Sequence, residues 1–410
     1  MNLTIKRVLQ LLMILIFFIF CQGAITAQEN EELGFDFQDI QTAVSSEKAP
    51  PKISSPAAVA IDTVNGRVLY NKNAFNKRQM ASTTKMMTAI LAIEKGNLND
   101  IVTVSKRAAY VGGSQANLKV GEKIKLGNLL YALMLPSGND AAIAIAEHIA
   151  GSVEDFVKVM DEKAYAIGAK NTKYGSPHGL DRNNYSTAYD LAVIARYCLS
   201  NPVFAEIVST ESKVIPREGT ENGKQYYNTN EMLGSYEGAD GVKTGYTGPA
   251  GRCLVTSATR EGWQVVSVVL GANSRSSRSS DSRKVLDYVF ANYPLVTVLS
   301  DGQRMESVTL VKGKKQQVSA VNKGDITLHI SDDELIGIQR EFILPEKIIA
   351  PVRKGQTIGK VIFKLEENPI GSCELYAGED IGFWTVDMNI GKIFKQWIEL
   401  KKLLQQNSII

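Results

Sequence analysis

The pattern of apolar residues changes at Pro294, and this change restricts the chain to folds with two different domains. Before Pro294, short strands and amphipathic helices follow one another. After it, short strands broken by Gly, Asn, Asp and Pro remain, at 308–311, 317–320, 326–330, 342–344 and 361–365. The chain has 410 residues, more than one ordinary core accommodates. We therefore predict an α/β (α+β) domain over 51–293 and a small all-β sandwich over 296–376.

Periodicity places the elements of the first domain. Strands at 59–62 and 67–70 alternate around the turn signal Asn65-Gly66 and predict a hairpin. A second pair of adjacent strands is predicted at 251–258 and 263–270. Helices are predicted where apolar residues recur every three or four positions, at 86–93, 126–133 and 140–150. The first of these ends at Gly96, and the third is nearly all apolar, which indicates a central helix.

The N-terminal residues predict export. Lys6 and Arg7 precede an apolar run at 8–20, and small residues follow as far as Ala27. This order is typical of a signal peptide over 1–27. A single membrane anchor is the alternative, but the run is shorter than the ~20 residues that a spanning helix needs. Residues 28–50 are polar and predict a linker.

The C-terminal residues 377–410 predict an amphipathic helix. Apolar residues recur at helical spacing on one face, and lysines fall mainly between them; the apolar face comprises Ile390, Ile393, Phe394, Trp397, Leu400 and Leu404. Such a helix lies in a membrane interface. The alternative is a helix docked on its own domain. We expect an exported protein, attached peripherally to the outer face of the cell membrane.

Charge and cysteine content exclude other classes. Lys and Arg number 46 against 43 Asp and Glu, without a basic stripe, so a nucleic-acid partner is not expected. Signal cleavage would leave Cys198, Cys253 and Cys373, which do not form a disulfide framework. We interpret them as buried small apolar residues, so packing must stabilise the core.

The three histidines, His148, His178 and His329, are interpreted as structural. No two of them have the spacing of metal ligands, and no Gly-x-Ser-x-Gly motif accompanies them. This pattern disfavours a zinc enzyme and a Ser-His-Asp hydrolase. We predict no metal and no organic cofactor.

A serine nucleophile without histidine needs another base, and a lysine with a lowered pKa can serve. Ser82 and Lys85 lie three residues apart at the start of the predicted helix, so both side chains lie on one face. The helix N-terminus opposes a charged lysine and favours a developing oxyanion. On its own this S-x-x-K motif is a weak signal, since a plain helix start has the same sequence.

Two further motifs make the first one specific. Ser137 and Asn139 lie in a tight loop between two predicted helices, and could relay a proton and bind an amide. The segment 243–247 precedes the strand at 251, with a cation and hydroxyls suited to a carboxylate and a glycine that admits a substrate backbone. Its residues are Lys243, Thr244, Gly245, Tyr246 and Thr247. The order S-x-x-K, S-x-N, K-T-G is much more specific than any one motif.

With these motifs the sequence resembles the penicillin-recognising serine D,D-peptidases, specifically the low-molecular-mass D-alanyl-D-alanine carboxypeptidases. The resemblance covers nearly the whole chain. Further similar segments are SPHGLD at 176–181, STAYDL at 186–191, ADGVKTGYT at 239–247 and AGRCLV at 250–255. APVRKGQTIG at 350–359 is similar to the family's C-terminal domain. The terminal helix resembles its membrane anchor.

The resemblance implies a role for each motif residue. Ser82 would be the acylated nucleophile, Lys85 its general base and Ser137 a proton relay. Asn139 would hold the substrate amide. Lys243, Thr244 and Thr247 would hold the terminal carboxylate, and the backbone N–H groups of Ser82 and Tyr246 would form the oxyanion hole. Arg278, seven residues after Gly271, is a second candidate for the carboxylate.

The implied substrate is a peptidoglycan stem peptide ending in D-Ala-D-Ala, with β-lactams as covalent inhibitors. One departure is Tyr246, where many relatives have histidine. A β-lactamase is a rival, but no glutamate between Asn139 and Lys243 begins an E-x-x-L-N motif. D,D-endopeptidase or transpeptidase activity, or a catalytically silent wall scaffold, remain alternatives. The sequence does not distinguish acceptors, because acceptor choice depends on the shape of the cleft.

Overall fold

The computed structural model describes residues 49–219, 221–384 and 394–400. The predicted signal peptide and nearly all of the predicted linker lie outside the described residues. So does most of the predicted C-terminal helix, of which 394–400 is helical.

An antiparallel five-stranded sheet, ordered β2-β1-β11-β10-β9, organises the first domain. Its strands are β1 (Ala57–Asp62), β2 (Val68–Lys72), β9 (Ala239–Thr247), β10 (Gly251–Arg260) and β11 (Trp263–Ala272). The two strand pairs predicted from the sequence are confirmed. Strand β9 lies at the edge of the sheet, so one side of its backbone is not paired with β10.

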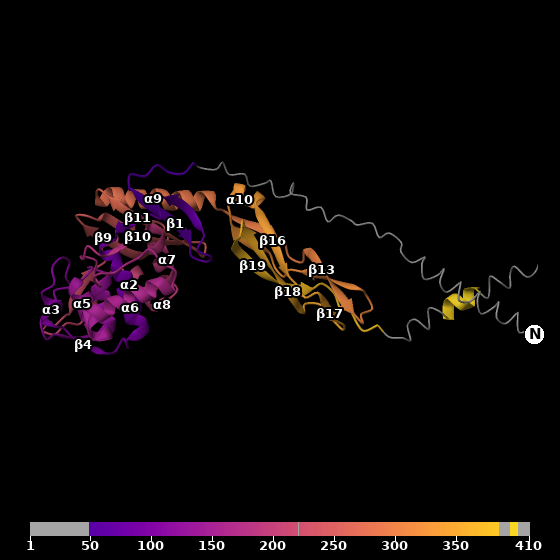
Figure 1. The fold of residues 1–410 in the computed structure, drawn as a ribbon, viewed down its shortest axis with the longest axis horizontal. Helices are drawn as coiled ribbons and strands as arrows, with labels where there is room; N and C mark the ends of the chain where they lie inside the picture. Colours follow the sequence, from indigo (N-terminus) through magenta and orange to yellow (C-terminus); the bar gives the residue numbers. More distant parts are fainter. Residues whose placement is uncertain (1–48, 220, 385–393, 401–410) are drawn as a thin grey trace, which may run out of the picture. The chain divides into compact units, whose positions relative to one another are not determined.

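Helices cover both faces of this sheet (Figure 1). On one face lies α9 (Arg275–Asn292). On the other are α2 (Lys85–Lys95), α4 (Leu126–Met134), α5 (Asn139–Ala150), α6 (Val153–Ala166), α7 (Ala188–Leu199) and α8 (Pro202–Ser209). Successive side chains of β1 point to opposite faces of the sheet. Val59 and Ile61 pack on the larger helical layer, whereas Ala58 and Ala60 pack on the α9 side.

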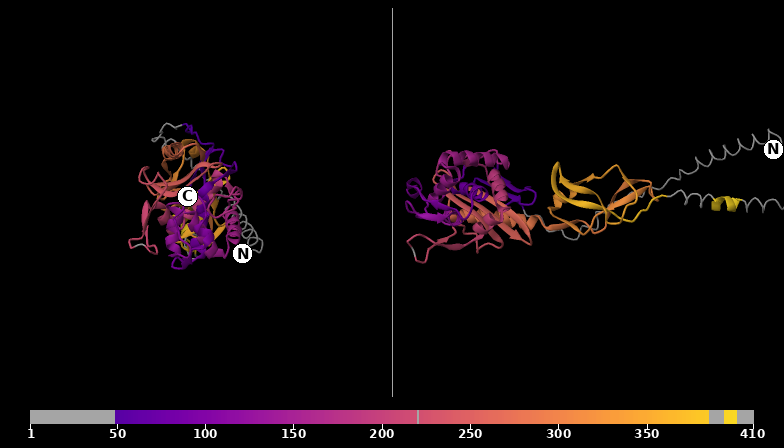
Figure 2. Two further views of the ribbon diagram at one scale, coloured as in Figure 1. Left: turned by 90° about the vertical axis from the view of Figure 1, so that its left-hand side faces the viewer. Right: turned by 90° about the horizontal axis from the view of Figure 1, so that it is seen from below.

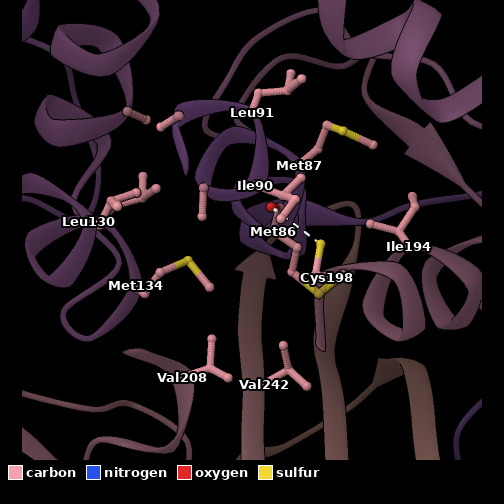
Figure 3. Close-up of a cluster of buried hydrophobic side chains, with 14 of the residues drawn as sticks. Met86, Met87, Ile90, Leu91, Leu130, Met134, Ile194, Cys198, Val208 and Val242 are labelled. Atoms are coloured by element: carbon pink, nitrogen blue, oxygen red, sulfur yellow. Dashed lines mark hydrogen bonds between the residues drawn. The ribbon is translucent and has the colours of Figure 1, made fainter. Parts of the chain in front are cut away.

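Helix α2 is the centre of the larger core. Met86, Met87, Ile90 and Leu91 are all buried, and side chains from α4, α7, α8 and β9 surround them (Figure 3). The Cys198 thiol donates to the Met86 carbonyl at 3.7 Å, which agrees with its interpretation as a buried core residue. Because α2 is buried from Lys85 to Ala92, its first residue is fixed in position relative to the sheet.

Short elements connect these layers. They are β3 (Arg78–Gln79), η2 (Ala81–Thr84), β4 (Ile101–Thr103), α3 (Lys106–Ala109), β5 (Lys123–Lys125), β6 (Tyr185–Ser186), β7 (Ser212–Ile215) and β8 (Lys224–Tyr227). The 3-10 turn η2 immediately precedes α2, so Ser82 lies in a tighter turn before the α-helix and not in its first turn as predicted.

The second domain begins with β12 (Leu295–Leu299) and contains two sheets. A six-stranded sheet is ordered β16-β18-β19-β14-β13-β17, and β12 pairs with β15. The strands of this domain are coloured orange to yellow in Figure 2. The other strands are β13 (Arg304–Val311), β14 (Gln317–Val321), β15 (Ile326–His329), β16 (Ile338–Ile343), β17 (Lys347–Ile349), β18 (Thr357–Leu365) and β19 (Asn368–Ala377). Their inner faces share one apolar core that includes Phe363 and Val361.

Two details of this domain differ from prediction. A short helix, α10 (Asp332–Ile336), interrupts the strands where a capping box starts at Ser331. The domain also continues past the predicted boundary at 376. Ile381 is buried in its core and pairs with Val352, so residues 377–384 belong to the β domain and not to a terminal helix.

No single helix in the described part of the chain is long and apolar enough to span a membrane. The bent pair α7 and α8 meets the criterion by length and composition only.

Candidate active site

The Ser82 hydroxyl and the Lys85 amine form the centre of the candidate site. Lys85 Nζ lies 3.0 Å from Ser82 Oγ, 2.7 Å from Asn139 Oδ1 and 3.0 Å from the His178 carbonyl oxygen. Ser82 lies in η2 and Lys85 begins α2, so the rigid central helix fixes their separation. Residues distant in sequence are thus hydrogen-bonded to the Lys85 amine. None of these three partners is a carboxylate.

The environment of Lys85 favours its neutral form. Its side chain is fully buried, and this desolvation lowers the pKa of the amine well below its ordinary value. The positive charge of Lys243 lowers this pKa further, whereas Asp140 raises it. A neutral amine at hydrogen-bond distance from a hydroxyl can accept its proton, as a general base must.

The loop before α5 supplies the second motif. Ser137 has φ 65°, an uncommon conformation for a non-glycine residue, and its buried Oγ has no hydrogen-bond partner among the described residues. Asn139 donates through Nδ2 to the Gly112 carbonyl at 2.6 Å and accepts from Lys85. The Asn139 amide therefore orients Lys85, while Ser137 presents an unpaired hydroxyl and is positioned by a sparsely populated backbone conformation.

Strand β9 supplies the third motif along the edge of the sheet. Lys243 is buried, and burial followed by the charge of Arg278 lowers its pKa to about 7. A Cβ added at Gly245 would lie 3.0 Å from Ser82 N and from the Met80 carbonyl oxygen. Only glycine therefore fits where β9 passes the nucleophile.

The hydroxyls of this strand make local hydrogen bonds. Thr244 Oγ1 lies 2.7 Å from Thr229 Oγ1, and both residues line the cleft. Thr247 Oγ1 accepts from the Ala250 N–H at 3.2 Å in the turn that follows β9. Thr244 thus borders the cleft, whereas the Thr247 hydroxyl caps the turn.

Arg278 lies in the cleft but already holds a carboxylate. Its Nη2 lies 2.5 Å and 2.6 Å from the two oxygens of Glu231, and Ser279 donates to the same carboxylate. This ion pair, with Ser279, lowers the pKa of Glu231 although partial burial opposes it. Sequence reasoning identified Arg278 but not Glu231.

Six of the predicted site residues border an open cleft of about 700 Å³, whereas Lys85, Asn139, Lys243 and Thr247 are not part of its lining. Its lining comprises Ser82, Ser114, Pro136, Ser137, Tyr227, Asn228, Thr229, Glu231, Thr244, Gly245, Tyr246, Arg252, Arg275, Ser276, Arg278 and Ser279. Tyr246 is exposed, and the Arg252 guanidinium lies 4.0 Å from its ring centroid. The two residues are directly opposite each other on β9 and β10, so they border the cleft together.

The three histidines occupy different environments. Burial, with the charges of Lys85 and Arg107, lowers the pKa of His178 to about 3, so its ring is neutral and unsuited to act as base near neutral pH. Its backbone carbonyl nevertheless belongs to the site. His329 stacks on Trp263, and His148 lies 3.2 Å from Asp100. In the described ranges, no group of three or more His, Cys, Asp and Glu residues could hold a metal ion.

The structure brings the predicted site residues together from η2, α2, the loop before α5, β9 and α9. Sequence reasoning missed the groups that contribute through the backbone or through charge pairing: the carbonyls of His178 and Gly112, and the side chains of Glu231 and Arg252. The SPHGLD segment was a signal for His178. The AGRCLV segment contains Arg252, whereas no motif marked Gly112 or Glu231.

A serine hydroxyl beside a buried lysine whose pKa is lowered, with a second serine and a cationic edge strand nearby, defines a serine acyl-transfer enzyme of the Ser-Lys type.

Comparison with known proteins is consistent with this class. Residues 43–274 match the family model described as D-alanyl-D-alanine carboxypeptidase, and residues 293–382 match that of the penicillin-binding protein 5 C-terminal domain. The D-alanyl-D-alanine carboxypeptidase DacF of Bacillus subtilis is 36% identical over 332 residues, which cover 79% of this chain and 85% of the relative. The chain belongs to the D-alanyl-D-alanine carboxypeptidase family, as its motifs predicted.

Solved structures are similar over both domains or over the first alone. Penicillin-binding protein 5 from Haemophilus influenzae has a TM-score of 0.64 at 31% identity, covering 82% of this chain and 99% of that one. The DD-transpeptidase of Streptomyces K15 has a TM-score of 0.57 at 38% identity, covering 60% of this chain and 100% of that one. The predicted fold, a D,D-peptidase domain followed by a β domain, is confirmed.

Proposed function

We propose that this chain carries out the serine D-Ala-D-Ala carboxypeptidase reaction of its family through an acyl-enzyme on Ser82. The observation that carries this assignment is the 3.0 Å separation between Lys85 Nζ and Ser82 Oγ, inside a buried site that lowers the pKa of the lysine. The substrate is a peptidoglycan stem peptide ending in D-Ala-D-Ala.

Acylation begins when the neutral Lys85 amine takes the proton of Ser82. The serine oxygen then attacks the carbonyl carbon between the two D-alanines, and the backbone N–H groups of Ser82 and Tyr246 stabilise the oxyanion. The C–N bond breaks, and Ser137 passes a proton to the departing amine. Its otherwise unpartnered hydroxyl in the cleft supports this role. Water then attacks the ester, releases the shortened peptide and restores Ser82.

The substrate's terminal carboxylate is held at the β9 edge. Lys243 contributes positive charge and Thr244 a hydroxyl, while the unpaired edge of the strand accommodates the substrate backbone. Arg278 is bound to Glu231 in this structure, so its contribution to carboxylate binding requires an exchange of partners or acts at longer range. Thr247 likewise would turn its hydroxyl from Ala250 toward the carboxylate.

Membrane attachment is the second part of the proposal. The N-terminal residues direct export, and the C-terminal helix holds the enzyme on the outer face of the cell membrane. Phe394, Trp397 and Leu400 are exposed in the helix 394–400, as a lipid-facing surface requires. The β domain stands between this helix and the catalytic domain in the chain.

D-Alanine release from a soluble peptide ending in D-Ala-D-Ala tests the reaction. The chain should release D-alanine, its Ser82→Ala variant should not, and Ser114→Ala, in the same cleft, should retain activity. Retained release by Ser82→Ala would contradict the assignment. Absence of release from the folded wild type, together with β-lactam labelling, would favour the endopeptidase or transpeptidase alternative, whereas absence of both would favour the silent scaffold.

A further inference from the structure

The edge of the β domain carries an exposed apolar surface. In the parallel pair of β13 and β17, Leu310 lies opposite Ile348 and Val311 opposite Ile349. Leu310 belongs to the buried core and Ile348 packs against it. Because side chains alternate along a strand, Val311 and Ile349 project from the opposite face, with 36% and 67% of their surface exposed.

The backbone of two exposed aromatic residues adjoins the turn that follows β13. Phe383 is bridged to Gly313, two residues after Val311, and the Trp384 N–H donates to the Lys312 carbonyl at 2.8 Å. Phe383 is 51% exposed and Trp384 45%. We call Val311, Ile349, Phe383 and Trp384 the edge patch. Exposed aromatic and β-branched residues gathered in one place on a domain usually mark a contact surface.

Several lysines lie next to the edge patch in the sequence and in the strand pairing. Lys312 and Lys314 lie on the turn that follows β13, are exposed, and have no acidic partner among the described residues. Lys347 opens β17 and pairs only with the exposed Glu346, at 3.4 Å. Apolar and aromatic side chains next to unpaired lysines match an anionic lipid surface, with apolar groups at the acyl boundary and ammonium groups at the phosphates.

The course of the chain favours lipid over a protein partner. Trp384 is the last described residue before the helix 394–400, so the patch lies where the chain leaves the β domain toward the proposed membrane helix. A single weak amphipathic anchor binds a membrane reversibly, and stable attachment takes two signals. We propose that the edge patch is a second membrane contact, which binds an anionic bilayer surface directly; this inference rests on the membrane attachment proposed above.

The tryptophans allow a direct test, because the chain has three. Trp263 is buried in the catalytic domain, Trp384 belongs to the patch and Trp397 to the helix. In the full chain with Trp397→Phe, vesicles of phosphatidylglycerol with brominated acyl chains should quench the emission of Trp384. The double variant Trp384→Phe, Trp397→Phe reports only Trp263 and should show no quenching.

Substitutions inside and outside the edge patch distinguish insertion of the patch into the bilayer from simple proximity to it. Ile349→Ser in the Trp397→Phe background should reduce Trp384 quenching at equal amounts of bound protein. Ile336→Ser, an exposed isoleucine in α10, should not. Lys312→Gln with Lys314→Gln should weaken vesicle partition by about a factor of five for each lysine.

Several results would overturn the proposal. Vesicle binding of the Trp397→Phe protein without Trp384 quenching would leave the helix as the anchor. Loss of all vesicle binding would refute the patch as a membrane contact. Quenching unchanged by Ile349→Ser would refute insertion of the patch. Concentration-dependent self-association that Ile349→Ser abolishes would assign the patch to a second copy. D-Alanine release from a soluble peptide does not require a membrane. Release by a protein that fails the vesicle tests would therefore refute the membrane contact and leave the proposed catalytic function intact.

Discussion

The catalytic domain buries charged side chains, whereas the β domain, as far as it is described, buries none. Lys85, Lys243 and Arg278 are almost completely inaccessible in the first domain. Across 295–384 the buried polar residues are Asn322 and Ser331, both uncharged. Both domains are stabilised by an apolar core, but only the catalytic domain must also accommodate buried charged groups.

The difference shows where function constrains the fold. A buried charge costs free energy unless it is paired, and lysines respond by losing their protons. The catalytic domain buries Lys85 and Lys243 despite this cost, as expected if a neutral amine and a nearby cation have the catalytic roles proposed above. The β domain has no such requirement, so its interior follows packing alone and its functional groups are expected on its surface.

The largest effect is expected from removing the buried base. Lys85→Met should lower kcat/KM for D-alanine release by about 10³-fold or more, because Ser82 loses its proton acceptor. The same change removes a buried amine, so thermal unfolding should shift little. Lys95→Met, at the exposed end of the same helix, is the control. Activity of Lys85→Met within tenfold of the wild type would show that another group acts as base.

Truncation in the β core should separate stability from catalysis. Phe363→Ala should lower the free energy of unfolding of the β domain by about 3–5 kcal/mol, because a fully buried ring leaves a cavity. D-Alanine release from a soluble peptide should stay unchanged at temperatures where the catalytic domain remains folded. Phe156→Ala, in the catalytic core, should lower both. A loss of activity from Phe363→Ala under these conditions would show that the two domains are coupled.

The buried lysines predict a pH profile. Lys85 must be neutral to accept a proton, so activity should rise with pH as its lowered pKa is passed. Lys243 must be charged to hold a carboxylate, so kcat/KM should fall as pH rises through its pKa of about 7, by up to about tenfold per pH unit above it. Lys243→Arg keeps its charge and should lose this falling limb. An unchanged limb in that variant would assign the fall to another group.

The smallest effect is expected at the rim of the cleft. Tyr246→His should change kcat/KM by only a few-fold, because the side chain is exposed and the proposed oxyanion contact is through the backbone. Its stacking with Arg252 would be weakened. Steady-state kinetics of Tyr227→His, exposed in the same cleft, provide the comparison. A hundredfold change at Tyr246 alone would indicate a direct role for its side chain.

Much of the catalytic domain could be predicted from the sequence because its elements carry local signals. The hairpin around Gly66, the nearly all-apolar α5 and the three motifs were visible without any tertiary information. The η2 turn was not, since both 3-10 and α turns place residues i and i+3 on one side of the helix. The capping box at Ser331 was a visible signal for α10, but the breaks around it resembled turns.

The parts of the site that were missed depend on long-range contacts. The His178 carbonyl reaches Lys85 across 93 positions, and any residue type offers a carbonyl. Glu231 meets Arg278 across 47 positions, and a lone glutamate carries no motif. The strands of the β domain were predicted, but its C-terminal boundary was not. Ile381 lies within the range predicted as a terminal helix, and only its pairing with Val352 assigns it to the β domain.

Ser82 should form the acyl-enzyme, and mass spectrometry after incubation with a penicillin would detect it on this residue. Intact protein should gain the mass of one β-lactam, and peptide mapping should place the adduct on Ser82. Lys85→Met should form this adduct far more slowly, and Lys95→Met at the ordinary rate. An adduct on Ser137, or the absence of an adduct from folded protein that releases D-alanine, would contradict the assignment.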